Sequence, residues 1–154
     1  MAQKSGQCVV VSSPATPQEN FTLAAPSRSV SSVEGGDGTL TWRLVGEFRD
    51  LIMKKCRRVY SKKGSRHDLG LFFHNGTFYA LGAWCGHMGG PLFEGDIEDY
   101  KGSCHVMCPW HAYMFDLKTG KNEIGLEQST HEVRVADGKV YIKHESPLSL
   151  YPFL

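Results

Sequence analysis

The chain lacks several features that would settle its class at once. Its 154 residues contain no apolar run of about 18, the length that a membrane-spanning helix needs, so we expect no membrane insertion. Neither charge sign dominates, because 17 basic residues face 16 acidic ones, and we expect no binding to nucleic acid. The N-terminal residues have neither the apolar core of a secretory signal nor the arginine content of a mitochondrial presequence. We therefore expect a cytoplasmic location.

Helical patterning is also scarce, whereas strand patterns are frequent. No segment has apolar residues at i, i+3, i+4 and i+7 beyond one turn near residues 50–53. Alternating runs on both sides of Asn75-Gly76 and of Asp137-Gly138 predict two β-hairpins. We therefore expect an all-β protein, an antiparallel β-sandwich or open barrel.

Composition divides the chain into three parts. Residues 1–38 are rich in Ser, Pro, Gly and Thr without a sustained period, which predicts a disordered tail. Residues 39–146 carry the strand patterns and predict one domain. Residues 147–154 are apolar but are interrupted by two prolines, Pro147 and Pro152. They are predicted to form a C-terminal tail.

Cysteines are few and odd in number, and two of them stand beside histidines. In a chain without a secretion signal, five cysteines predict free thiols or metal ligands rather than a disulfide framework. The candidate ligands are Cys85 and His87 in "CGH", and Cys108 and His111 in "CPWH", with twenty residues between the pairs. Each pair follows a predicted strand, so two loops would project side by side. Each loop would then contribute one thiolate and one imidazole.

Two metal centres fit these four candidate ligands. A mononuclear zinc site uses two Cys and two His, although its usual order groups the Cys together and the His together. A [2Fe–2S] cluster with His in place of Cys on one iron needs the two types mixed, as they are here. The interleaved order favours the cluster, and zinc remains the alternative.

The stretch "CGHMGGPL" followed by "CPWHAYMFDLKTG" resembles the Rieske iron–sulfur family, and within it the Rieske-type ferredoxins. The resemblance extends over about residues 40–144. It implies one [2Fe–2S] cluster per chain, held by a two-loop cluster-binding subdomain. Cys85 and Cys108 would bind the buried iron, and His87 and His111 the exposed one.

Departures from the family's respiratory branch predict a low reduction potential. That branch has a further Cys in each loop, where this chain has Gly90 (or Gly89) and Trp110. It also has a Ser and a Tyr whose hydroxyls donate to sulfur, where this chain has Tyr113 and Phe115. Because fewer donors stabilise the reduced cluster less, we expect roughly −150 mV rather than about +300 mV.

Apolar residues and prolines around the candidate ligands are predicted to support the site. We expect Trp110, Met88 and Leu92 to exclude water from the inner iron, and Pro91 and Pro109 to stiffen the loops.

Strand alternation in "GSCHVM" predicts a small buried thiol at Cys104 and a surface imidazole at His105. Cys56 is expected to be structural.

Two charged segments leave their roles open. The basic segment 54–66 is expected to be a solvated edge strand, with a docking patch for an acidic redox partner and a weak nucleic-acid patch as alternatives. The acidic segment 94–100 is expected to be a solvated loop near the cluster.

The resemblance implies an electron carrier rather than an enzyme. Rieske oxygenases add a mononuclear iron in a second domain, and only 43 residues follow His111 in this 154-residue chain. We therefore expect a monomeric carrier that passes electrons between a reductase and an oxygenase, hydroxylase or other acceptor. A zinc-stabilised interaction module and a redox sensor are the alternatives.

Overall fold

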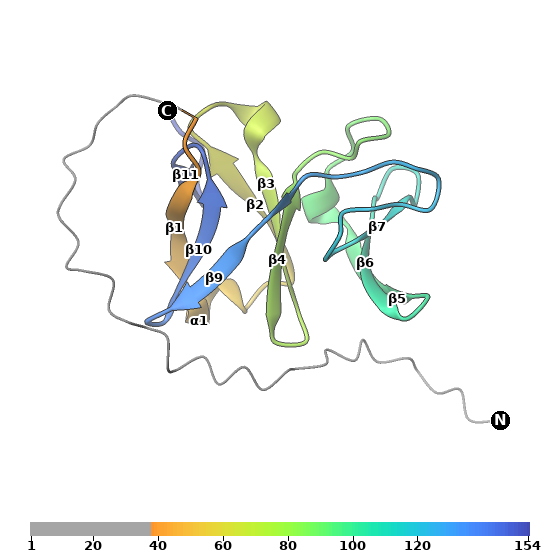
Figure 1. Ribbon diagram of the computed structural model, residues 1–154, viewed down its shortest axis with the longest axis horizontal. Helices are drawn as coiled ribbons and strands as arrows, with labels where there is room; N and C mark the ends of the chain where they lie inside the picture. The colour runs from red at the N-terminus through yellow and green to blue at the C-terminus, as the bar shows by residue number, and fades with distance from the viewer. Residues whose placement is uncertain (1–37) are drawn as a thin grey trace.

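The computed structural model describes residues 38–154, so the predicted tail lies outside the described residues except for Gly38. Within this range the protein consists of antiparallel strands, one four-residue α-helix and two short 3₁₀ helices. Figure 1 shows the strands gathered into three sheets. The predicted all-β class is confirmed.

The sheets are formed by strands from distant parts of the chain. The first has the order β1-β10-β9, the second β11-β2-β3-β4-β8 and the third β5-β6-β7. The strands are β1 (Thr41–Glu47), β2 (Cys56–Ser61), β3 (Leu69–His74), β4 (Thr77–Gly82), β5 (Asp96–Tyr100), β6 (Ser103–Met107), β7 (Met114–Asp116), β8 (Thr130–His131), β9 (Val133–Ala136), β10 (Lys139–His144) and β11 (Leu148–Ser149). The helices are α1 (Phe48–Leu51), η2 (Ser65–His67) and η3 (Leu92–Glu94).

Both predicted hairpins are present with the expected turns. β3 pairs with β4 around Asn75-Gly76, and β9 pairs with β10 around Asp137-Gly138. Both residues of each turn have positive φ: 48° and 78° in the first, and 51° and 73° in the second. Such values define type I′ turns, whose twist matches that of the flanking strands.

The five-stranded sheet is the middle layer and contributes to two cores. Leu69 and Leu71 of β3 pack with Val140 and Ile142 of the first sheet. Phe72, on the opposite face of β3, packs with Val106 of the third sheet. Complete burial of such side chains contributes about 1.5–3 kcal/mol each. Side chains on the two faces of β3 therefore pack against the first sheet on one side and the third sheet on the other.

The second core extends directly to the candidate ligands. Cys85 and Cys108 belong to it, together with Leu92 and Phe115, which are fully buried. The loops that carry the two cysteines are therefore anchored in packed apolar side chains rather than on the open surface.

Two segments differ from their sequence-based expectations. The acidic segment 94–100 is mostly strand β5, paired with β6 from Asp96↔Met107 to Tyr100↔Ser103, so the predicted loop is wrong. Ile97 is half-buried against the second core, and half-buried Tyr100, on the opposite face of β5, packs against His105. In the C-terminal segment 147–154, Leu148 and Ser149 pair with β2. The domain boundary at residue 146 stays a prediction.

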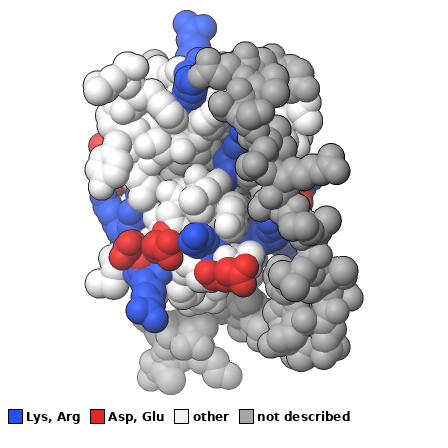
Figure 2. Space-filling view, turned by 90° about the vertical axis from the view of Figure 1, so that its left-hand side faces the viewer, with Lys and Arg blue, Asp and Glu red and all other residues white. Residues whose placement is uncertain are grey.

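The surface away from the third sheet carries both charge signs. Figure 2 views the left-hand side of Figure 1, and in the lower part of this face basic and acidic groups lie beside one another. None of the helices formed by residues 38–154 is long and apolar enough to cross a membrane.

Candidate metal centre

The first ligand loop is closed by a short hydrogen-bonded frame. It leaves β4, and a β-bridge joins Trp84 to Pro91 at its base. The Cys85 N–H donates to the Gly90 carbonyl at 2.7 Å, and the Gly89 N–H donates to the Cys85 carbonyl at 2.8 Å. Gly89 has φ 76°, which a glycine adopts without strain. The frame fixes the backbone on both sides of His87.

The second ligand loop repeats this frame between β6 and β7. The Cys108 N–H donates to the Tyr113 carbonyl at 2.8 Å, and the Ala112 N–H donates to the Cys108 carbonyl at 3.0 Å. Ala112 has φ 57°, so it occupies the position that Gly89 holds in the first loop, four residues after the cysteine. Two loops with different sequences thus present their Cys and His on the same backbone scaffold.

The structure brings the four predicted site residues to one end of the fold in two layers. Cys85 and Cys108 are 4% and 2% exposed, respectively. His87 and His111 are exposed, and their ring centroids lie 5.1 Å apart at an interplanar angle of 89°. The sulfurs therefore lie beneath a pair of solvent-facing imidazoles.

Backbone groups already point at one of the sulfurs. Burial raises the pKa of the Cys85 thiol, and the adjacent Cys108 thiol raises it further. The N–H groups of His87 and Met88 are directed at the Cys85 sulfur and act in the opposite direction on its pKa. Such N–H···S contacts stabilise a thiolate, which is the form that binds a metal.

Gly90 makes room for the sulfur of the second loop. A Cβ atom at this position would lie 2.7 Å from Cys108 Sγ and 3.1 Å from Trp110 Cγ. Only a residue without a side chain lets the two loops approach this closely. Two buried sulfurs, two exposed imidazoles and a side-chain-free cradle fit a mixed Cys/His centre.

Gln128 ties the first ligand loop to the rest of the domain. Its Oε1 accepts from the Gly86 N–H at 2.7 Å, and its Nε2 donates to the Trp84 and Gly82 carbonyls at 2.8 and 3.3 Å. The side chain is buried, at 5% exposure. Sequence analysis missed this residue, because a lone Gln after a turn carries no local signal of a contact 42 residues away.

The predicted apolar shield is only partly correct. Leu92 is fully buried, but Met88 and Trp110 are 64% and 58% exposed. They instead form an exposed apolar rim beside the histidines. Tyr113 lies against the His87 ring with a centroid distance of 4.3 Å, so it holds that imidazole from one side.

The surface position predicted for His105 is wrong, although Cys104 and His105 do lie on opposite faces of β6. Cys104 is partly buried against the second core, whereas His105 is buried on the other face and packs edge-on against Tyr100, with ring centroids 5.4 Å apart. The ring of Tyr100, from the paired strand β5, covers that imidazole. Cys56 is half-buried, and burial and nearby Asp96 raise its pKa to about 11, consistent with an inert thiol.

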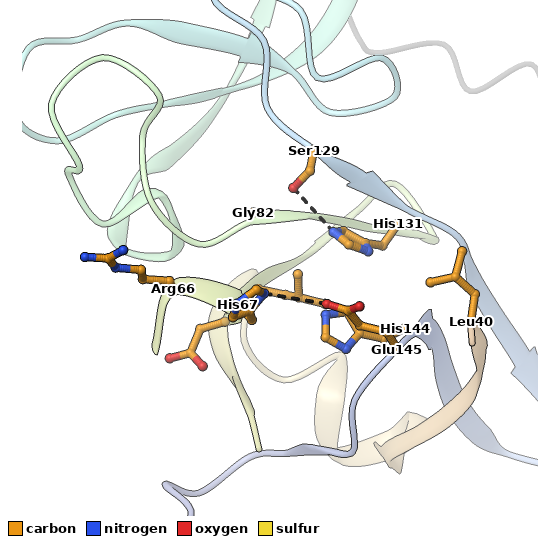
Figure 3. A pocket seen from close by; sticks show the side chains of 10 residues that line it. Leu40, Arg66, His67, Gly82, Ser129, His131, His144 and Glu145 are labelled. Carbon is orange, nitrogen blue, oxygen red and sulfur yellow. Dashed lines mark hydrogen bonds and ion pairs between the residues drawn. The ribbon is translucent and has the colours of Figure 1, made fainter. Parts of the chain in front are cut away.

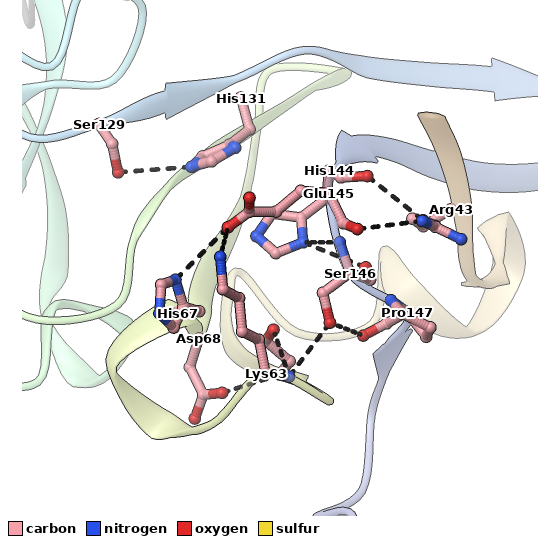
Figure 4. A network of polar contacts seen from close by, with 11 residues as sticks. Arg43, Lys63, His67, Asp68, Ser129, His131, His144, Glu145, Ser146 and Pro147 are labelled. Atoms are coloured by element: carbon pink, nitrogen blue, oxygen red, sulfur yellow. Dashed lines mark hydrogen bonds and ion pairs between the residues drawn. The ribbon is translucent and has the colours of Figure 1, made fainter. Parts of the chain in front are cut away.

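A polar pocket of about 290 Å³, which we call the histidine pocket, lies at the end of β4, where the first ligand loop begins. Figure 3 shows His67, His131 and His144 around it, with Ser129 and Gly82 at the side of the ligand loop. In Figure 4 the Glu145 carboxylate, which lines this pocket, accepts from Lys63 Nζ at 2.8 Å and lies 3.7 Å from His67 Nδ1. The pocket is separate from the four candidate ligands.

A three-layer β fold that carries two matched Cys/His loops defines an iron–sulfur protein of the Rieske class. The family model of soluble Rieske-type ferredoxins matches residues 44–124, and the chain belongs to this family. The Rieske family is one of iron–sulfur proteins.

Individual relatives agree with this assignment. The human "Rieske domain-containing protein" is 33% identical over 111 residues, covering 61% of this chain and 70% of that protein. The ferredoxin subunit of 3-phenylpropionate/cinnamic acid dioxygenase from Photorhabdus laumondii is 37% identical over 79 residues, covering 49% and 71%. A solved complex of reduced oxygenase and oxidised ferredoxin in carbazole 1,9a-dioxygenase contains a chain with TM-score 0.58 and 27% identity, covering 68% and 94%.

Proposed function

We propose that the chain is a one-electron carrier with one [2Fe–2S] cluster, in which Cys85 and Cys108 bind one iron and His87 and His111 bind the other. The observation that carries this proposal is the layering of two buried sulfurs beneath two exposed imidazoles. When bound, the cluster supplies a reversible one-electron step. The chain keeps water from the inner ligands through its second core and presents the outer ligands to solvent.

The ligand types explain why His is useful here. Two thiolates and two neutral imidazoles bring two negative charges, where four thiolates would bring four. A site with these residues is therefore easier to reduce than an all-cysteine site.

Zinc is disfavoured by the spread of the ligand atoms. Among the described residues, no three of Cys85, His87, Cys108 and His111 have ligand atoms that all lie within 4.8 Å of one another. Tetrahedral zinc, with bonds of about 2.0–2.3 Å, holds its ligand atoms within about 4 Å of one another. The absence of such a close group among these four residues favours a centre with two metal atoms over a single zinc ion.

Anaerobic purification with visible and EPR spectra tests this function. We expect a reddish-brown protein with two iron atoms and two acid-labile sulfides per chain, and a rhombic EPR signal after reduction. A colourless protein with one zinc atom per chain would instead establish the interaction module.

We further propose a potential at the low end of the Rieske range, roughly −150 mV. Phe115, which has no hydroxyl, is fully buried in the core that holds both sulfurs. A redox titration that gave a midpoint well above zero would contradict this proposal.

The partners we propose are a reductase that donates electrons and an oxygenase or hydroxylase that accepts them. The support is the similarity to a dioxygenase ferredoxin subunit and to a chain in a solved complex of an oxygenase with a ferredoxin. We propose that the chain is a cytoplasmic monomer and not itself an enzyme. Sedimentation of the iron-loaded protein and fractionation of cells that express it are the corresponding measurements.

A further inference from the structure

A groove lies between the start of β2 and both ligand loops. Its volume is about 570 Å³, within the usual range of binding sites. We call it the basic groove and define it by Lys54, Arg57, Arg58, Trp84, Gly89 and Trp110. The cations of the basic segment 54–66 therefore lie on two different surfaces. Those at its start line the basic groove, whereas Lys63 pairs with Glu145 and Arg66 lines the histidine pocket.

Arg58 forms a wall of the basic groove and is already neutralised. Its Nε and Nη2 donate to Asp68 Oδ2 at 2.8 and 2.6 Å. Its guanidinium also stacks on Tyr60 and Trp84, with centroid distances of 4.6 and 4.8 Å. This arginine therefore contributes a flat surface and little net charge.

Lys54 and Arg57 are the cations that remain available. Neither has a carboxylate within salt-bridge distance among residues 38–154. The one acidic residue that lines the basic groove is Glu94. Two unpaired cations against one carboxylate leave the lining positive, although the chain as a whole is nearly neutral.

Backbone carbonyls hold Arg57 in position, and its Nε lacks an acceptor within residues 38–154. Its Nη2 donates to the carbonyls of Asp50 and Leu51 at 3.2 and 3.4 Å. Its Nε is buried and has no hydrogen-bond partner in the described part of the chain. The guanidinium is therefore fixed in orientation by backbone carbonyls and has no carboxylate partner among the described residues, which suits its accessible nitrogens to a carboxylate from another chain.

The basic groove ends at the proposed outer ligands. Gly89 and Trp110 belong to the two ligand loops, two residues after His87 and one before His111. Whatever occupies the groove therefore lies beside the exposed imidazoles. Trp84 and the exposed Trp110 offer it aromatic surface, the residue type enriched at protein interfaces.

We propose that the basic groove docks an acidic segment of the redox partner, with Asp or Glu carboxylates on Lys54 and Arg57 and apolar atoms against Trp84 and Trp110. This rests on the proposed function only in that the partner exchanges electrons. Docking at the basic groove is steered by charge and weakens as salt rises.

Calorimetric titration with a short poly-L-glutamate peptide tests the charge complementarity. We expect binding at low salt, with Lys54→Glu weakening it about tenfold and Arg57→Lys, which keeps the charge but loses the planar fork, about threefold. Lys118→Glu, an equal charge change at an exposed residue outside the groove, should alter it less than about twofold. Equal losses in Lys54→Glu and Lys118→Glu, or no binding by the wild type, would overturn the proposal.

A kinetic measurement tests the position of the bound segment. The reduced protein gives one electron to hexacyanoferrate(III), which becomes hexacyanoferrate(II). Saturating peptide should slow this oxidation severalfold in the wild type and not in Lys54→Glu, because the occupied basic groove covers the approach to His87 and His111. An unchanged rate at saturation would place the peptide elsewhere and reject the proposal.

The two proposals fail separately. The calorimetric titration needs no cluster. If anaerobic purification gives a protein without iron that still binds the peptide, the electron carrier is rejected and the basic groove is kept as a docking site. An iron-loaded protein that does not bind the peptide rejects the groove and keeps the carrier.

Discussion

Gly90 shows how one missing side chain positions two ligands. Its backbone carbonyl accepts from the Cys85 N–H, and its open side receives Cys108 Sγ. We expect Gly90→Ala to push Cys108 away, to destabilise the fold by about 1–3 kcal/mol and to reduce iron content. The control is Gly46→Ala, whose Cβ would meet its nearest neighbour at 3.4 Å. Iron analysis and thermal unfolding check both variants, and a normal iron content in Gly90→Ala would contradict the argument.

Phe115 offers a test of the potential at one atom. The residue is fully buried in the core that contains both ligand cysteines. We expect Phe115→Tyr to raise the potential by on the order of tens of millivolts, because a hydroxyl there donates toward sulfur. Phe73→Tyr adds the same hydroxyl in the other core and is the matched control. A shift of equal size in both variants would show that the effect is not local.

At the scale of elements, the first ligand loop depends on a side chain from outside it. Replacing Gln128 by Ala removes three hydrogen bonds and leaves the Gly86 N–H without its acceptor. We expect a loss of about 1–3 kcal/mol in the free energy of unfolding and faster release of iron at low concentrations of denaturant. Glu127→Ala, at the exposed neighbour, should change neither. Denaturant titration followed by absorbance and by circular dichroism separates iron loss from unfolding.

The elements that sequence analysis predicted well are those with local signals. The hairpins around Asn75-Gly76 and Asp137-Gly138 follow from turn chemistry, and the two ligand loops follow from the spacing of Cys and His. The acids of residues 94–100 predict a loop rather than strand β5, because the pairing with β6 and the contacts of Ile97 and Tyr100 leave no alternating pattern in the sequence.

The rest of the site could not be predicted, because it depends on contacts between distant residues. Gln128 acts on Gly86, and Gly90 acts on Cys108, through tertiary structure alone. The exposure of Trp110 and the burial of His105 against Tyr100 likewise depend on contacts between elements, which periodicity within one strand does not determine.

For the whole molecule, a pair of histidines at the boundary between two sheets predicts sensitivity to acid. His131 of β8 belongs to the five-stranded sheet and His144 of β10 to the first sheet, and their ring centroids lie 5.4 Å apart. Burial lowers the pKa of both imidazoles, and the neighbouring His144 lowers that of His131 further. Glu145 acts in the opposite direction on both pKa values.

The lowered pKa values of His131 and His144 mean that acid destabilises the folded chain. Because the unfolded chain binds protons more readily, the stability is complete above the ordinary histidine pKa of about 6.5 and is lost as the pH falls below it. Each imidazole contributes a slope of at most about 1.4 kcal/mol per pH unit.

Denaturant unfolding between pH 7 and pH 5 measures that slope. We expect His131→Gln to flatten it, while Lys118→Gln, which changes no group that titrates in this interval, should leave it as in the wild type. A wild-type stability that rose on acidification would refute the assignment.

The hydrogen bonds of Gln128 also fix the order of events during biosynthesis. The first ligand loop leaves the ribosome 42 residues before the side chain that holds its Gly86 N–H, and the second ligand loop emerges between the two. Until residue 128 and strand β8 have emerged, Cys85 and Cys108 stand in loops without their full support. We therefore expect the two ligand loops to hold iron stably only after residue 128 and strand β8 have been synthesised.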